Sequence, residues 1–230
     1  MSYLAKFYEV LNSGECEQAV NKIEKLSEHW EAHGNVLYTL GSPVYQNTCN
    51  MSAYYYKAKV FNELLWANFN QLYEKVLLVL SAYVMDEVFF YKNVSIPGFH
   101  IFVLETPYAG GGMHFDLPHQ SLSWKMPVKI LPRFITFTLA LELPKSGAGI
   151  NLWNLSYDEV MSKGIRFQDI PALTGSIQSA YQSYEVGKIA IFEGLYLHGI
   201  APIQLVEGTE KRITLQGHII NLNNTWMAYW

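Results

Sequence analysis

The spacing of apolar residues changes near residue 86, and this change limits the possible folds of the chain more than any other feature. Before that point, apolar residues recur at three- and four-residue steps, which is typical of amphipathic helices. After it, short apolar or alternating runs lie between glycines and prolines, a pattern typical of strands. Helices followed by many strands favour an α+β protein in which the helices pack on one sheet.

Two helical regions are predicted in the first third of the chain. Residues 19–30 carry an apolar stripe at helical spacing, and we expect this helix to end near Gly34. The second region spans about 53–84 and exceeds the usual helix length, so two consecutive helices are an alternative. Between the two regions, residues 36–46 are expected to form a short strand and a turn.

Six segments are predicted to form strands, namely 99–106, 113–117, 134–142, 150–154, 188–193 and 212–221. Most are apolar on both faces or alternate with Thr, Gln or His, so we expect one face to meet the helices and the other to line a barrel. Residues 155–187 interrupt the strands, and Ser156 and Glu159 there form a capping box for a short helix. A long insertion in a barrel is often a lid over a site.

We therefore predict one domain over residues 1–230, with a mainly helical part at 1–85 and a β-barrel core at 86–230. Half of the 230 residues are apolar and 16% are charged, against about 25% in an average protein. Such a chain can bury a large core and is not intrinsically disordered. The net charge is −4 and no run of Lys and Arg is present, so no nucleic-acid partner is expected.

The sequence also lacks the marks of membrane insertion and export. No stretch approaches the roughly 20 consecutive apolar residues of a transmembrane helix, and the N-terminus lacks the pattern of a signal peptide. Cys16 and Cys49 make neither a disulfide framework nor a zinc site. We expect a soluble, cytoplasmic protein with no membrane partner, either a monomer or a homodimer.

Three residues form a candidate metal site. His114 and Asp116 lie two positions apart in a predicted strand, so both side chains can point to one face and meet one ion. Glycines 110–112 before them and Pro118 after them indicate a bend that delivers this strand. His198 follows a predicted strand and a glycine turn and opens the next strand. Two imidazoles and one carboxylate make the facial triad of non-haem Fe(II) sites, which leaves coordination positions open.

Arg212 and Thr214 form a candidate anion site. They come after His198 in a predicted strand, where positions 212, 214, 216 and 218 share one face and Ile213 and Leu215 take the other. A guanidinium and a hydroxyl therefore point into the barrel together. A buried Arg needs an anion, and its planar fork suits a carboxylate. His218 shares this face, and we expect it to be a hydrogen-bonded core residue.

These residues resemble the pattern of the Fe(II)- and 2-oxoglutarate-dependent dioxygenases. That pattern is His-x-Asp, a distal His and then Arg-x-Ser or Arg-x-Thr, which here maps onto His114, Asp116, His198, Arg212 and Thr214. Three further runs are similar to the small prolyl-hydroxylase-like branch of the family: Gly187-x-Ile-x-Ile-Phe192, Gly208-x-x-x-Arg212 and Gly149-x-x-x-Trp153. The resemblance covers about residues 98–221.

The resemblance implies a double-stranded β-helix (jelly-roll, cupin-like) barrel that holds Fe(II) at His114, Asp116 and His198. It implies that 2-oxoglutarate chelates the iron and pairs its distal carboxylate with Arg212 and Thr214. O₂ then oxidises this co-substrate to succinate and CO₂ while a substrate C–H bond is activated. Halogenating members have Gly or Ala in place of Asp116, so hydroxylation is expected here, with desaturation and ring closure as alternatives.

The substrate is expected to be a small molecule such as an amino acid or a biosynthetic intermediate, with protein prolyl hydroxylation as the main rival. Tyr108 is a further candidate for a hydrogen bond to 2-oxoglutarate. Candidate substrate contacts are His119, Trp124, Arg133, Asn151, Trp153, Arg166, Tyr181 and Tyr184. The alternative class is a non-oxygenase, cupin-like protein that binds a metal or a small acid, although a cupin usually offers more histidines close together.

Overall fold

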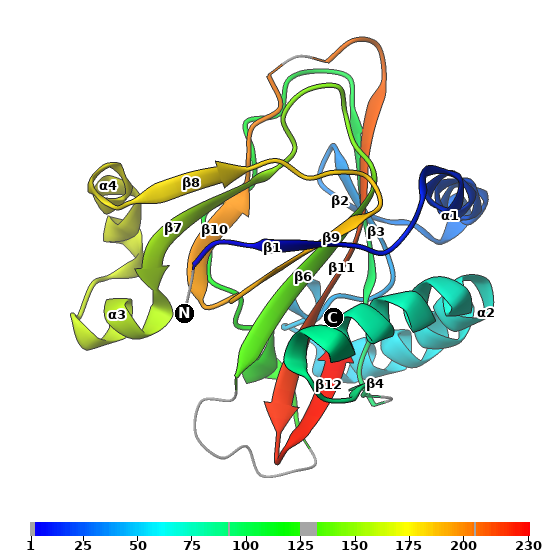
Figure 1. The fold of residues 1–230 in the computed structure, drawn as a ribbon, viewed down its shortest axis with the longest axis horizontal. Coiled ribbons are helices and arrows are strands. Elements are labelled where there is room, and N and C mark those ends of the chain that lie inside the picture. The colour runs from blue at the N-terminus through cyan, green and yellow to red at the C-terminus, as the bar shows by residue number, and fades with distance from the viewer. Residues whose placement is uncertain (1–2, 92, 125–132, 205) are drawn as a thin grey trace.

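The fold combines two β-sheets with a layer of helices (Figure 1). The computed structural model describes residues 3–91, 93–124, 133–204 and 206–230. The helices are α1 (Ser13–Lys25), α2 (Met51–Val84), α3 (Tyr157–Ser162) and α4 (Ile170–Leu173). The strands are β1 (Lys6–Glu9), β2 (Glu31–His33), β3 (Leu37–Leu40), β4 (Val88–Phe90), β5 (Gly98–Leu104), β6 (Phe134–Glu142), β7 (Ile150–Ser156), β8 (Ser179–Gln182), β9 (Lys188–Phe192), β10 (Tyr196–Ile200), β11 (Glu210–Leu222) and β12 (Thr225–Tyr229).

The two sheets are built almost entirely from antiparallel pairs. The larger has the strand order β1-β9-β6-β11-β5-β3-β2, with β12 pairing with β11 and, in parallel, with β4. The smaller has the order β10-β7-β8. Figure 1 shows α1 and α2 on one side of the larger sheet and β7, β8 and β10 on the other. The predicted α+β class is confirmed.

Alternation along the strands of the larger sheet gives it two different faces. Ile135, Phe137 and Ile213 are fully buried in the core cluster that contains the apolar residues of α1 and α2. Thr136 and Thr138, which alternate with them, point the other way and line a cavity. The helices therefore cover one face of the sheet and leave the other for a site, as the sequence predicts.

The helices differ from the predicted ones mainly at their ends. Helix α1 begins at a capping box formed by Asn12 and Glu15 and ends at Lys25, earlier than predicted, because a 3-10 turn and β2 follow it. Helix α2 has non-helical backbone angles at Phe69, where two helical stretches meet at a kink, so the alternative of two consecutive helices is confirmed. In the described part of the chain, no helix combines the length and apolar character needed to cross a membrane.

Five of the six predicted strands are present, as β5, β6, β7, β9 and β11. The exception is the segment 113–117, which forms no strand; in it His114 makes an isolated bridge with His198. Gly110 has φ +97°, a conformation that side-chain-bearing residues avoid, so the glycines interrupt the ladder at this point. The short strands β1, β2, β4, β8 and β12 were not predicted, because three to five residues carry little periodic signal.

The interruption at 155–187 begins as predicted. Ser156 Oγ accepts a hydrogen bond from the Glu159 N–H at 3.2 Å, and the Glu159 carboxylate accepts one from the Ser156 N–H at 3.1 Å. This capping box starts α3. The rest of the segment contains α4 and β8, and β8 extends the smaller sheet at its edge.

Candidate metal centre

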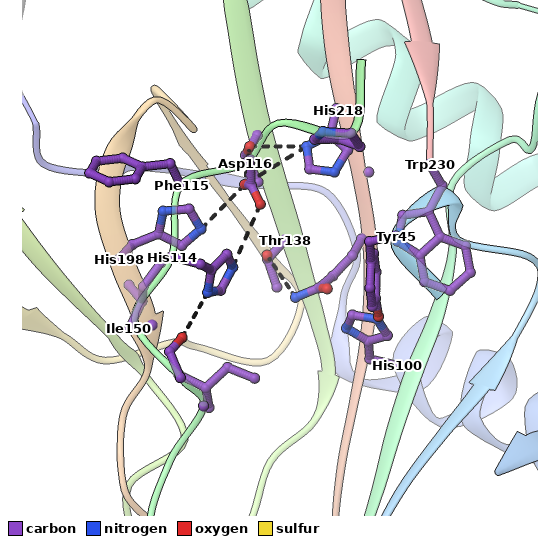
Figure 2. Close-up of a pocket in the computed structure, with 18 of the residues that line it drawn as sticks. Tyr45, His100, His114, Phe115, Asp116, Thr138, Ile150, His198, His218 and Trp230 are labelled. Carbon is purple, nitrogen blue, oxygen red and sulfur yellow. Dashed lines mark hydrogen bonds and ion pairs between the residues drawn. The ribbon is translucent and has the colours of Figure 1, made fainter. Parts of the chain in front are cut away.

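His114, Asp116 and His198 lie together between the two sheets, as Figure 2 shows. One ligand atom from each lies within 4.8 Å of the other two. His114 Nε2 is 3.6 Å from Asp116 Oδ1, and His198 Nε2 is 3.2 Å from Asp116 Oδ2. His198 is buried while His114 is partly open to solvent. A single ion can therefore contact all three side chains from one accessible side.

Backbone pairing explains why residues so distant in sequence meet here. The His114 N–H donates to the His198 carbonyl at 2.9 Å, and the His198 N–H donates to the His114 carbonyl at 3.0 Å. The Asp116 N–H donates to the Gly194 carbonyl at 2.8 Å, and this bond continues the pairing of the two segments beyond His114. Directly opposed residues of an antiparallel pair present their side chains on the same face.

A carbonyl oxygen orients each imidazole. His114 Nδ1 lies 2.7 Å from the Gly112 carbonyl, and His198 Nδ1 lies 2.8 Å from the Tyr196 carbonyl. A carbonyl can only accept, so each Nδ1 carries a hydrogen, and in the neutral imidazole Nε2 then keeps its lone pair. Metal-binding histidines are held in this way, with the second ring nitrogen donating to a carbonyl or carboxylate.

Two acceptors face each other at the centre of the group. The Nε2 lone pair of His198 points at Asp116 Oδ2, so the contact needs a cation, either a proton on His198 or a metal ion. Burial would lower the pKa of His198, but the Asp116 carboxylate outweighs burial and raises it. Burial would raise the pKa of Asp116, but His198 and His218 hold it well below its usual value. The donor set and its charge fit a divalent cation.

A cavity of about 690 Å³ opens beside these ligands, with a lining drawn from both sheets. Figure 2 shows Tyr45, His100 and Trp230 across the cavity from His198. Tyr45 Oη lies 2.5 Å from His100 Nε2, and the Trp230 ring packs on His100 with a centroid distance of 5.2 Å. Among the described lining residues, Asp116 is the single carboxylate and neither Lys nor Arg is present. Apart from Asp116 the walls are therefore close to neutral, and Phe, Tyr and Trp rings form part of them.

Arg212 lies directly behind one wall of the cavity. Its side chain is fully buried between the rings of Phe102 and Tyr184, 5.4 and 5.5 Å from their centroids, and both rings line the cavity. Its Nη1 donates to Thr214 Oγ1 at 3.3 Å, whereas no described residue accepts a hydrogen bond from Nη2. Burial lowers the pKa of this guanidinium. A buried cation with an unused donor fits an anion.

The sequence matches no protein-family model and no curated protein. Its structure is similar to that of an N-substituted L-amino acid dioxygenase from Burkholderia ambifaria, solved with alpha-ketoglutarate, at 14% identity and a TM-score of 0.60 over 99% of this chain and 86% of that one. This chain has the fold of that oxygenase.

Two further structures have the same fold. AviO1 from Streptomyces viridochromogenes matches with a TM-score of 0.50 at 14% identity, over 93% of this chain and 90% of its own. SnoN, a non-heme alpha-ketoglutarate-dependent epimerase of nogalamycin biosynthesis, matches with a TM-score of 0.50 at 9% identity, over 94% and 78%. The predicted resemblance to 2-oxoglutarate-dependent oxygenases is confirmed in the fold.

Two predicted substrate contacts on β7 lie away from the cavity. Ile150 lines the cavity, so Asn151 and Trp153, at the positions that alternate with it, face the other side of the strand. Asn151 borders a smaller hollow together with Tyr181. Trp153 packs against a separate apolar cluster.

Other predicted contacts also lie away from the cavity. The His119 ring packs on Phe134 at a centroid distance of 4.9 Å, and Trp124 donates from Nε1 to the His119 carbonyl at 2.9 Å. Arg133 lies 3.9 Å from the Glu193 carboxylate, and Arg166 pairs with Asp169 at the surface. By contrast, Tyr108 and Tyr184 do line the cavity next to Arg212.

Several residues that line the cavity were not predicted from the sequence. Thr136 and Thr138 could have been found, because they alternate with the core residues of β6. Tyr45 and Trp230 could not, because they reach the cavity from a 3-10 turn and from the end of the chain. His100 shares the cavity face of β5 with Phe102.

Proposed function

We propose that the chain is an Fe(II)- and 2-oxoglutarate-dependent oxygenase with a double-stranded β-helix core, acting on a C–H bond of a small molecule. The observation that carries the proposal is the pair of Nε2 lone pairs, freed by carbonyl-bound Nδ1 atoms, that converge on Asp116. Imidazole nitrogen with carboxylate oxygen is the donor set of non-haem iron sites. His114, Asp116 and His198 would hold the ion.

Arg212 supports 2-oxoglutarate as the co-substrate. Its Nη2 lacks a partner among the described residues, and its charge lies in an aromatic surrounding with no counter-ion, so the distal carboxylate of 2-oxoglutarate would complete its bonding. Thr214 already accepts from Nη1 and keeps the guanidinium in place. Tyr108 and Tyr184 would flank the same carboxylate.

When bound, iron, 2-oxoglutarate and O₂ supply the oxidising power, with succinate and CO₂ as products. The chain's own residues orient the reactants and exclude water. The aromatic walls, which include Phe102, Tyr184 and Trp230, provide a cavity large enough for a small substrate beside the ligands. Because Asp116 occupies the carboxylate position, hydroxylation is the proposed outcome, with desaturation and ring closure as variants of it.

The test is an anaerobic titration of the metal-free protein with Fe(II) and then 2-oxoglutarate. We expect a weak visible charge-transfer band that grows and saturates, and then succinate release in a screen of small molecules. Iron binding without the band would contradict the role of 2-oxoglutarate and favour a metalloprotein of another kind. If neither binds, the oxygenase proposal fails and the small-acid binding protein becomes the leading interpretation.

A further inference from the structure

A chain of hydrogen bonds holds Asp116 from the side that faces the larger sheet. The Thr136 hydroxyl lies 2.6 Å from Asp116 Oδ2, and His218 Nδ1 lies 3.0 Å from the same hydroxyl. Figure 2 shows Asp116 between His198 on one side and His218 on the other. The carboxylate is therefore contacted both by a candidate ligand of the ion and by residues that take no part in the ligand set.

The direction of these bonds can be assigned from chemistry. An ionised carboxylate only accepts, so the single hydroxyl hydrogen of Thr136 must point at Asp116. The hydroxyl oxygen then accepts from His218, which places the histidine hydrogen on Nδ1. Each donor in the series polarises the next, which strengthens the last bond to the carboxylate.

The surroundings fix this chain in one geometry. Thr136 and His218 are directly opposed on β6 and β11 and are both buried. The His218 ring stacks on Phe134 at 5.1 Å and packs on Tyr229 at 5.6 Å. A Cβ at Gly194 would lie 2.2 Å from Thr136 Oγ1, so the close approach of this hydroxyl requires glycine at that position.

The two carboxylate oxygens are consequently unlike. Oδ2 accepts the Thr136 hydroxyl, whereas no described residue donates a hydrogen bond to Oδ1. Oδ2 also lies 3.2 Å from His198 Nε2, and this direct contact would be replaced when an ion binds that nitrogen. A carboxylate free to turn could offer both oxygens to an ion, but one oxygen here is already bound to the protein. We propose that Thr136, supported by His218, is a positioning residue that binds Oδ2 and leaves Oδ1 as the metal ligand. This inference rests on the proposed metal site.

The test measures Co(II) binding in the absence of 2-oxoglutarate, because the visible absorption of Co(II) reports its coordination. Thr136→Val keeps the shape of the side chain and removes the hydroxyl; Thr136→Ser keeps the hydroxyl. The matched control is Thr138→Val. Thr138 lies two positions after Thr136 on the same face of β6, and its hydroxyl accepts a hydrogen bond from Gln216 rather than donating one to Asp116. Circular dichroism and the melting temperature of each variant establish that it folds.

We expect Thr136→Val to weaken Co(II) binding by about 10- to 100-fold and to change the visible spectrum, since loss of a residue that orients a ligand typically costs this much. Thr136→Ser and Thr138→Val should bind and absorb as the wild type does. Equal behaviour of Thr136→Val and Thr138→Val would overturn the inference, and so would a Ser variant that fails to restore the wild-type spectrum. If the wild type itself binds no Co(II), the proposed metal site fails instead.

A second arm tests the outer member of the chain. His218→Phe keeps a ring between Phe134 and Tyr229 but removes the donor, whereas His218→Asn places an amide donor near the position of Nδ1. We expect His218→Phe to weaken Co(II) binding in the same direction as Thr136→Val but by less, with His218→Asn closer to the wild type. If both variants match the wild type, His218 has no part in positioning.

Discussion

The backbones of His114 and His198 donate hydrogen bonds to each other in both directions, at 2.9 and 3.0 Å. This reciprocal pair, rather than the flexibility of two side chains, sets the distance between the two imidazoles, whose ring centroids lie 4.5 Å apart. The spacing of two of the three candidate ligands is therefore a property of the main chain. Substitutions of the side chains should change ligation while leaving this pairing intact.

Replacement of His198 tests the ligand set. His198→Ala removes a buried Nε2 that faces Asp116, so we expect it to abolish stoichiometric Fe(II) binding and succinate formation. Equilibrium dialysis under anaerobic conditions measures the bound iron. His29→Ala, at an exposed position in a 3-10 turn, is the control and should bind iron as the wild type does. Iron retained by His198→Ala would refute the assignment.

Replacement of Arg212 tests the co-substrate site. A ligand that binds only the folded state stabilises it by about 2.7 kcal/mol at 100 times its Kd, so 2-oxoglutarate should raise the melting temperature of the iron-loaded wild type. Arg212→Met fits an unbranched chain between Phe102 and Tyr184 without a charge, and we expect it to lose this shift while still binding iron. The exposed Arg166→Met serves as the control. An undiminished shift in Arg212→Met would show that another residue binds the distal carboxylate.

His100 should make the protein sensitive to acid. Burial, with a smaller contribution from Arg212, lowers the pKa of His100 to about 3, against 6.5 in the unfolded chain. Between these values the unfolded state binds a proton that the folded state does not, so stability is present above pH 6.5 and is lost as the pH falls towards 3. One such group contributes a slope of up to about 1.4 kcal/mol per pH unit.

The free energy of unfolding in urea, measured at several pH values, checks this contribution. His100→Gln, which does not titrate, should show a shallower acid slope than the wild type over the same range. Identical slopes in the two proteins would mean that the acid sensitivity has another source.

Gly98 should be needed for the position of Trp230. A Cβ at Gly98 would lie 2.1 Å from Cζ3 of the Trp230 ring and 2.8 Å from the Leu40 carbonyl oxygen. We expect Gly98→Ala to destabilise the protein by about 1–3 kcal/mol, as overpacked cores do, and to displace Trp230 from the cavity wall. At Gly112 an added Cβ would meet no atom within 4 Å, so Gly112→Ala should lie within about 0.5 kcal/mol of the wild type. Chemical denaturation measures both, and equal stabilities would contradict the packing argument.

The candidate metal ligands could be proposed from the sequence because His114 and Asp116 lie two positions apart and His198 lies in a short strand that follows a glycine turn. Strand periodicity likewise placed Arg212 and Thr214 on one face, where the structure has them bonded to each other. Their roles as metal and carboxylate ligands remain proposals. The helical layer and the strands β6 and β11 were predictable because their patterns extend over many residues.

The substrate side of the cavity was not predictable, and β7 shows why. Apolar residues occur on both faces of this strand, so its sequence did not say whether Ile150 or Asn151 faces the cavity. Shifting the assignment of faces by one residue exchanges the two faces of the strand. Asn151 and Trp153 were expected at the cavity, and the structure places them on the opposite face. Tyr45 lies outside any periodic element, so its place beside His100 follows from tertiary packing alone.

The pairing of His114 with His198 gives an ion at this site a further effect. The two segments belong to distant parts of the chain, and between them lie β6, β7 and the insertion. An ion bound by both would hold the two ends of this stretch together in the folded state only, so its binding free energy would add directly to the stability of the fold. The metal ion that takes part in the reaction would then also stabilise the attachment of the smaller sheet to the rest of the protein.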